Sequence, residues 1–233
     1  MFNVQHHDRI ESTSDEAKRL AAEGAPHGTA VHADEQVAGR GRFGKTWHSP
    51  PGNLYLSVVL RLDIPPARGG ELSFVTALAV ADAVDALLPK HTRATLKWPN
   101  DVLVNGGKIA GILVEQIEGA RVVGIGVNIL EAPHNAPYKT ATVVGSGGLA
   151  TVDGALEILL ERLEARLDVW IEEGFWPVRE AWLARAHPIG TPLRANVGDR
   201  VEAGTFAGLD EDGALLLDTE SGRMRIVAGE VSA

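Results

Sequence analysis

The chain has 233 residues, of which 45% are hydrophobic, so it can bury one full core and a small second one. A net charge of −9 disfavours a general role at nucleic acids or anionic membranes. The absence of cysteine excludes disulfides, thiol chemistry and Cys-based zinc sites. Residues 1–10 lack the apolar core of a signal peptide, and no apolar run approaches the length of a membrane span. We therefore expect a soluble, cytoplasmic protein.

The N-terminal region is predicted to contain one helix. Residues 12–16 (STSDE) precede a helical run that ends at Gly24, with Thr13 and Glu16 spaced as a capping box. The N–H groups at such a helix start can seat a polar ligand ring. The eight histidines show no metal-ligand spacing, so we interpret His6 and His7 as part of a flexible terminus rather than as ligands.

A strand over residues 28–34 is predicted to deliver Gln36 to a loop with the sequence GRGRFGKTW, residues 39–47. Its three glycines allow the backbone to approach a ligand, and its two arginines and one lysine supply cations, which suits an anion such as phosphate. Residues 39–46 have the spacing Gly-x-x-x-x-Gly-Lys-Thr, but we do not interpret them as a Walker A loop, because the segment lies between two predicted strands and a Walker A loop leads from a strand into a helix. Taken alone, the segment also fits a solvated surface loop or an RNA-contacting Arg-Gly segment.

The centre of the chain alternates between strand-like and helical patterns. The predicted strands cover 53–62, 93–98, 101–104, 108–115 and 122–130, and a packing helix covers 71–88. A tight turn at 105–107 joins two of the strands into a hairpin. Strand alternation places Lys108 on the same face as Ala110 and Ile112, where a lysine needs a partner. The alternative is a gatekeeper charge on an edge strand.

The C-terminal part is predicted to contain a long loop, two helices and a series of short strands. Residues 131–148 are predicted to be a long loop, a type of segment that often acts as a lid. Two amphipathic helices follow over 152–173 and 177–187, the second with Trp182 on its apolar face. From residue 189 onward, short strand-like runs separated by turns predict a small all-β barrel.

Four motifs carry a resemblance to a known family: QVAGRGR at 36–42, KWPND at 97–101, KIAGILVE at 108–115 and GIGVN at 124–128. In this order they closely resemble biotin protein ligases, the biotin–[acetyl-CoA-carboxylase] ligase family, and the resemblance runs from about residue 9 to the C-terminus. It implies an α+β fold with a mixed central sheet backed by helices, class II synthetase-like, over residues 1–188. It also implies an SH3-like barrel over residues 189–233.

The resemblance implies two half-reactions. Biotin and Mg-ATP give biotinyl-5′-AMP and pyrophosphate, and a lysine of a biotin carrier domain, such as that of acetyl-CoA carboxylase, then takes the biotinyl group. Mg²⁺ is therefore an expected cofactor, and neither nucleic acid nor a membrane is an expected partner. Some relatives carry an N-terminal DNA-binding domain; only about ten residues precede the match here, so we expect no such role. Whether the enzyme is a homodimer is left open.

The resemblance also assigns the site. It implies contacts to biotin and the adenylate from Ser12, Thr13, Ser14, Gln36, Gly39, Arg40, Gly41, Arg42, Trp47, Asn100, Lys108, Gly111 and Asn128. Arg42 and Lys108 are the expected catalytic residues. Ser14 stands where the family has Asn, Asp101 is a candidate Mg²⁺ ligand or a turn cap, and Trp47 is alternatively an ordinary core residue. The loop over 39–47 is expected to be disordered without ligand and to close over it.

Two rival functions stay open at this point. A lipoate ligase shares the architecture, but the Gly-Arg-Gly-Arg sequence of residues 39–42 differs from the Arg-Arg and Gly-Gly-Gly pattern of that family. A non-catalytic module that binds RNA or a protein partner through the Arg-Gly loop would not need the block over 97–115. Salt-sensitive RNA binding without ATP turnover would favour the second rival.

Overall fold

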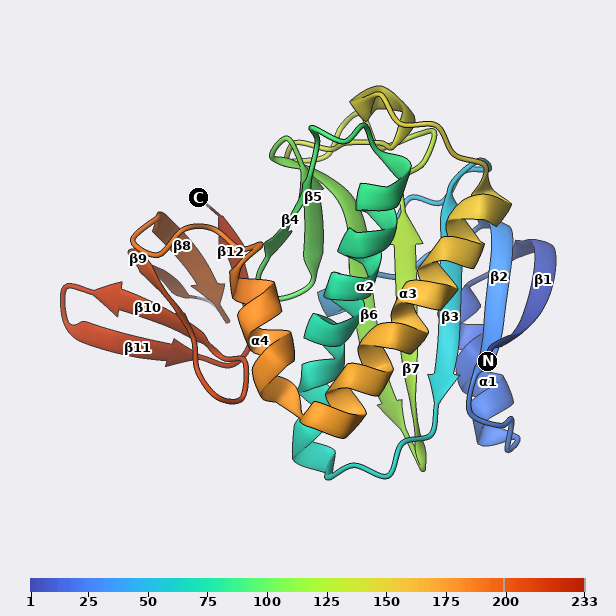
Figure 1. Cartoon of the computed structure of the whole chain (residues 1–233), viewed down its shortest axis with the longest axis horizontal. Helices are drawn as coiled ribbons and strands as arrows, with labels where there is room; N and C mark the ends of the chain where they lie inside the picture. Colours follow the sequence, from blue (N-terminus) through green and yellow to red (C-terminus); the bar gives the residue numbers. More distant parts are fainter. Residues whose placement is uncertain (199, 233) are drawn as a thin grey trace.

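The computed structural model describes residues 1–198 and 200–232, which form a seven-stranded sheet and a five-stranded sheet (Figure 1). The larger sheet has the strand order β1-β2-β3-β7-β6-β5-β4, and the smaller one β11-β10-β9-β8-β12. β1 pairs with β2 in parallel, whereas every other pair of neighbouring strands in the larger sheet is antiparallel. The predicted mixed central sheet with a small antiparallel C-terminal sheet is therefore confirmed.

The strands of the two sheets and the helices have the following bounds. The larger sheet consists of β1 (Asn3–Ile10), β2 (Thr29–Gln36), β3 (Leu54–Leu60), β4 (Ala94–Lys97), β5 (Asp101–Val104), β6 (Gly107–Ile117) and β7 (Ala120–Val127). The smaller sheet consists of β8 (Pro192–Val197), β9 (Arg200–Leu209), β10 (Leu215–Thr219), β11 (Gly222–Ile226) and β12 (Glu230–Ser232). The helices are α1 (Thr13–Ala22), α2 (Glu71–Leu87), α3 (Val152–Glu173) and α4 (Phe175–Leu183), with 3₁₀ turns η1 (Arg42–Gly44), η2 (Pro66–Gly70) and η3 (Val144–Ser146).

Helices cover both faces of the larger sheet. α2 and α3 pack on one face, in the main apolar core, and α1 packs on the other (Figure 1). Val58 belongs to the main core and its neighbour Val59 to the core under α1, so β3 is buried on both faces. This explains its continuous apolar run, because a strand covered on both sides has no solvent face. None of the helices in the described ranges combines the length and apolarity needed to cross a bilayer.

The N-terminus differs from the prediction in two respects. Residues Asn3–Ile10 form β1 and pair with β2, so the expected flexible terminus is wrong. Most side chains of β1 are polar and exposed, and its backbone hydrogen bonds to β2 rather than an apolar pattern define it. The N-cap of α1 is Ser12, whose Oγ accepts a hydrogen bond from the Asp15 N–H at 3.3 Å. The predicted cap at Thr13 is therefore wrong by one residue.

A β-bulge in β6 turns Lys108 away from the core. Leu103 pairs with Lys108 and Val102 with Ala110, so Ile109 is an extra residue on this strand. Ile109 and Ala110 both belong to the main core. The predicted shared face of Lys108 with Ala110 and Ile112 is therefore wrong, because the alternation assumed a regular strand.

The smaller sheet lies beside the β4 edge of the larger one (Figure 1). The indole Nε1 of Trp98 donates to the carbonyl oxygen of Gly213 at 3.0 Å in a buried position. Arg179 on α4 donates to the carbonyl oxygens of Leu209 and Asp210. These contacts place the C-terminal strand β12 next to the loop over residues 39–47.

Asn53, at the start of β3, holds the end of β7 and provides a test of this arrangement. Its buried side chain accepts hydrogen bonds from the N–H groups of residues 129–131 at 2.9 to 3.1 Å and donates to the Glu131 carbonyl. Asn53→Ala leaves these groups without partners, and we expect the free energy of unfolding to fall by about 2–4 kcal/mol. Urea denaturation measures this change. Asn135→Ala, an exposed change in the same loop, is the control and should alter it by less than about 0.5 kcal/mol; equal effects would contradict the assignment.

Candidate active site

A cavity of about 500 Å³ lies on the α1 side of the larger sheet, between that sheet, the loop over residues 39–47 and β12. Five basic side chains line it: Arg40, Arg42, Lys45, Lys97 and Lys108. Two acidic side chains, Asp101 and Glu230, complete its charged lining among the described residues. The cavity is thus locally positive in a chain of net charge −9, which suits anionic ligands.

Most of the predicted site residues meet in this cavity. Its lining includes Thr13, Ser14, Gln36, Arg40, Gly41, Arg42, Trp47, Asn100, Lys108 and Gly111. Three others do not line it. Ser12 is buried as the cap of α1, and a Cβ at Gly39 would lie 2.5 Å from Ser49 Oγ, so Gly39 forms the packed base of the loop. Asn128 lines an adjoining cavity of about 490 Å³ together with Trp47 and Lys108.

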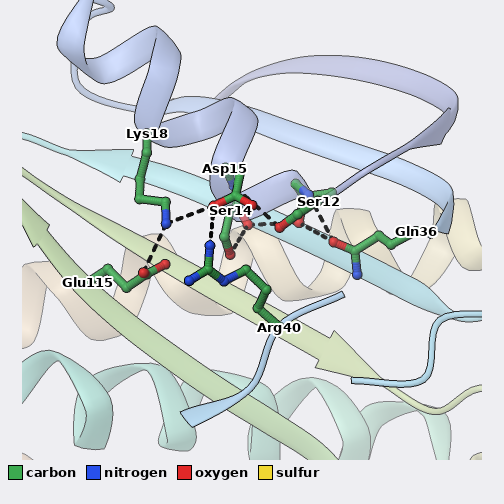
Figure 2. Close-up of polar contacts among 9 residues, drawn as sticks. Ser12, Ser14, Asp15, Lys18, Gln36, Arg40 and Glu115 are labelled. Atoms are coloured by element: carbon green, nitrogen blue, oxygen red, sulfur yellow. Dashed lines mark hydrogen bonds and ion pairs between the residues drawn. The ribbon is translucent and has the colours of Figure 1, made fainter. Parts of the chain in front are cut away.

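The loop over residues 39–47 is attached to three different parts of the chain. Arg40 Nη1 lies 2.8 Å from Asp15 Oδ1 on α1 (Figure 2). Lys45 Nζ lies 2.6 Å from Glu230 on β12. Arg42 Nη1 donates to Asn100 Oδ1 at 3.1 Å, and burial lowers the pKa of this guanidinium, which still stays charged at neutral pH. All three cations thus face protein groups at the cavity; ligand-dependent closure of the loop stays a prediction.

Hydroxyl groups and one amide form a connected network at the start of α1. Gln36 Oε1 accepts from the Thr13 N–H at 2.8 Å and from Thr13 Oγ1 at 3.0 Å, while its Nε2 donates to Ser49 Oγ at 2.9 Å. Ser57 Oγ lies 2.8 Å from Thr13 Oγ1 and 3.1 Å from Ser14 Oγ. Because the Thr13 hydroxyl donates to Gln36, Ser57 donates to Thr13 and Ser14 donates to Ser57. This direction leaves the lone pairs of Ser14 Oγ available to a ligand N–H.

Asp101 holds the two lysines of the cavity in place. Its Oδ1 lies 2.6 Å from Lys108 Nζ and its Oδ2 lies 2.9 Å from Lys97 Nζ. The Asp101 side chain is only 12% exposed; this burial acts to raise its pKa, but the two ammonium groups outweigh it and hold the pKa below its usual value. Each carboxylate oxygen is therefore engaged by a cation. Two adjacent ammonium groups would repel a divalent metal, so this donor set does not fit the predicted Mg²⁺ ligand.

Three glycines leave space on the floor of the cavity. A Cβ at Gly126 would lie 2.4 Å from Trp47 Nε1, and one at Gly111 would lie 2.9 Å from the same indole ring. A Cβ at Gly124 would lie 2.6 Å from Ser14 Oγ. Trp47 is half-buried and its ring centroid lies 5.4 Å from Lys108 Nζ, so it lines the cavity rather than filling the core.

Several residues at the cavity were not singled out by the sequence. From the sequence alone, Asp15 is an acid in the first turn of α1 that complements the helix dipole. In the structure its carboxylate also pairs with Arg40 and with Lys18, and Lys18 pairs in turn with Glu115 (Figure 2). Glu230 reaches the loop from the other sheet. Such pairs bridge distant parts of the chain, and no local pattern in the sequence indicates them.

The ion pairs of Asp101 predict a defined pH dependence of stability. The folded-state pKa lies below the ordinary value of about 3.9, so the contribution of this carboxylate is complete above that value and is lost as the pH falls through the folded-state pKa. We expect Asp101→Asn to lower the free energy of unfolding by a constant amount from pH 7 to about pH 5, and by less below about pH 4. Denaturant titrations at a series of pH values measure this difference.

The matched control for that series is Asp212→Asn. Asp212 pairs with Arg225 but its side chain is 74% exposed, so the change should be small at every pH. A destabilisation by Asp101→Asn that grows on acidification would contradict the account of Asp101.

Comparison with known proteins adds independent findings to this geometry. The chain is 41% identical over 237 residues to the biotin--[acetyl-CoA-carboxylase] ligase of Paracoccus denitrificans, covering 96% of this chain and 97% of that protein. The biotin protein ligase of Aquifex aeolicus, solved in complex with biotin and ATP, has a TM-score of 0.85 at 29% identity over 99% of this chain and 97% of that one. The enzyme of Leishmania major, solved with biotinyl-5-AMP, has a TM-score of 0.70 at 25% identity over 97% of this chain and 99% of that one.

Two family models match the chain itself. Residues 189–233 match the biotin protein ligase C terminal domain. Residues 7–130, which contain the cavity loop, the Asp101 hairpin and the glycine-rich floor, match the biotin/lipoate A/B protein ligase family. Because this second match covers more than half of the chain and is supported by relatives along its whole length, the chain belongs to the biotin/lipoate A/B protein ligase family.

Proposed function

We propose that this chain activates biotin with ATP to form biotinyl-5′-AMP and transfers the biotinyl group to a lysine of the biotin carrier domain of a carboxylase. The observation that carries the proposal is the ring of five basic side chains around one cavity whose floor is kept open by glycines. The names of the relatives from Paracoccus and Aquifex, and the biotin and ATP bound to the latter, support the same substrates here. A non-catalytic RNA-binding loop would have no use for basic groups that line a cavity and are paired with protein groups.

The ureido ring of biotin is suited to the polar network at the start of α1. Ser14 Oγ, whose proton is directed to Ser57, can accept a hydrogen bond from a ring N–H. The amide of Gln36 is locked by Thr13 and Ser49, so it holds the Thr13 hydroxyl in one orientation. Ser14 thus serves as an acceptor where the family has Asn. Ser12 contributes indirectly, because it caps the helix that carries both hydroxyls.

The first half-reaction brings two anions together. An oxygen of the biotin carboxylate attacks the α-phosphorus of ATP, and the bond from that phosphorus to the bridging oxygen breaks, so pyrophosphate leaves with the electron pair. Arg40, Arg42 and Lys108 offset the repulsion between carboxylate and triphosphate and stabilise the charge that develops. Asp101 is a positioning residue that keeps Lys108 aimed into the cavity. Mg²⁺ enters with ATP as its substrate complex, and we assign it no protein ligand.

The second half-reaction needs no nucleophile from this chain. The amine of the carrier lysine attacks the acyl carbon of biotinyl-5′-AMP, loses a proton, and AMP leaves. Water has to be kept from the adenylate until the carrier arrives. The loop over residues 39–47 and β12 cover the cavity for this purpose, joined by the Lys45–Glu230 ion pair. We divide the chain into a catalytic domain over 1–188 and a C-terminal domain over 189–233, and the second domain completes the rim of the site.

Biotin-dependent exchange of labelled pyrophosphate into ATP tests the proposed adenylation. We expect exchange with biotin, and none with lipoate or without any acid. Exchange with lipoate alone would make the chain a lipoate ligase. Absence of exchange with either acid would mean that the cationic cavity binds another ligand, and the proposed function would be wrong.

Lys108→Ala should lower the rate of exchange by about 100- to 1,000-fold, because it removes one cation that acts on the developing charge. The matched control is Lys139→Ala, since Lys139 is an exposed lysine whose Nζ donates only to the Asn105 carbonyl among the contacts described. Circular dichroism verifies that both variants are folded. A folded Lys108→Ala enzyme with normal exchange would contradict the assigned role.

A further inference from the structure

Three side chains with metal-binding atoms gather on the face of the larger sheet opposite the active-site cavity. His6 on β1 and His32 on β2 are direct partners in the parallel register, and Asp34 follows two residues later on the same face of β2. Val31, the neighbour of His32, packs under α1, so His32 faces the other side, where α3 lies. Nothing in the proposed biotin chemistry uses these three residues.

The geometry of the three groups is compact. One ring nitrogen of each histidine and one carboxylate oxygen of Asp34 all lie within 4.8 Å of one another. His6 Nε2 and Asp34 Oδ1 are 2.9 Å apart, and the two imidazole rings are stacked with their centroids 5.3 Å apart. A tetrahedral zinc ion with bonds of about 2.1 Å holds its donor atoms about 3.4 Å apart. Because His6 and Asp34 are half exposed, small rotations of these two side chains suffice to bring the donors together.

His32 provides a second, independent observation. Its side chain is deeply buried, with the residue only 2% exposed, and its Nε2 has no hydrogen-bond partner within the described part of the chain. Leaving a buried polar nitrogen unpaired costs free energy, and such a group in a folded protein calls for an explanation. A cation bound to the imidazole of His32 would give this buried ring a partner that the surrounding side chains do not.

We propose that His6, His32 and Asp34 form a binding site for a divalent transition metal, with Zn²⁺ as the best-suited ion. Two imidazoles and one carboxylate are a common donor set for zinc, with water in the fourth position. The metal takes the place of the proton that His6 and Asp34 share. Asp153, near the start of α3, acts electrostatically on both imidazoles and adds negative potential to the site.

The proposed ion joins the edge strand β1 to β2. β1 lies at the edge of the larger sheet, and the chain continues from its last residue, Ile10, directly into the cap and first turn of α1. A metal that fixes β1 on β2 therefore also fixes the segment that leads to Ser14. The role is structural, and the site is distinct from the cavity on the opposite face.

Titration of the chelator-treated protein with Zn²⁺ by calorimetry, and with Co²⁺ by visible absorption, tests the proposal. We expect one ion per chain and ligand-field bands of a site with nitrogen and oxygen donors. Because replacing the buried His32 endangers folding, the test variants are the half-exposed His6→Gln and Asp34→Asn. Each should weaken Zn²⁺ binding by at least about tenfold.

The matched control is His7→Gln, which changes the next residue of the same strand on the opposite face. It should leave Zn²⁺ affinity unchanged. Hydrogen exchange of the β1 amides should slow on addition of Zn²⁺ in the wild type and in His7→Gln, but not in His6→Gln. Absence of stoichiometric binding, or equal affinity of the wild type and His6→Gln, would overturn the proposal.

Discussion

The carboxylate of Asp101 between the ammonium groups of Lys97 and Lys108 is the interaction on which the active site depends. An acidic chain has to concentrate positive charge in one cavity, and cations that lie close together repel one another. A buried carboxylate between two of them offsets this repulsion and fixes their directions. Its depressed pKa keeps it ionised at neutral pH, so the arrangement does not depend on small changes in acidity.

The backbone around this cluster serves the same purpose. The bulge at Ile109 turns Lys108 out of the core while both Ile109 and Ala110 stay buried in it. Gly111 and Gly126 then leave room for the indole of Trp47 beside Lys108, and Gly124 leaves room for Ser14. Core packing and ligand binding are thus properties of the same strands: on β7, Val123 and Val127 pack in the main core, while Gly124 and Gly126 line the cavity on the other face.

Much of the fold could be predicted because its signals are local. The amphipathic pattern of α3 gave its bounds, Val152–Glu173, and the turn at 105–107 gave the hairpin that carries Lys108. β1 was missed because a polar edge strand has little apolar periodicity, and its pairing with β2 is set by backbone hydrogen bonds. The bulge was missed for a related reason. One extra residue reverses which side chains face the core and which face the cavity, and the amino-acid composition of the strand gives no sign of it.

The candidate site likewise has residues that the sequence predicts and residues that only the structure shows. The motifs around Arg42, Asn100 and Lys108 could be found from the sequence, and the structure brings these residues to one cavity. The partners that hold the loop could not be found, because Asp15 and Glu230 reach it from elements remote in the sequence. The histidines of β1 did not indicate a metal site in the sequence either, since strand pairing alone brings the residues of β2 beside them.

A crystal structure of the chain with biotinyl-5′-AMP would show whether the cation held by Asp101 acts on the adenylate. We expect the adenylate to occupy the cavity beside Trp47, with Lys108 Nζ within hydrogen-bond distance of the oxygens at the acyl-phosphate linkage while Asp101 still holds that lysine. An adenylate bound elsewhere, or a Lys108 side chain that turns away from it, would exclude the proposed role of Lys108.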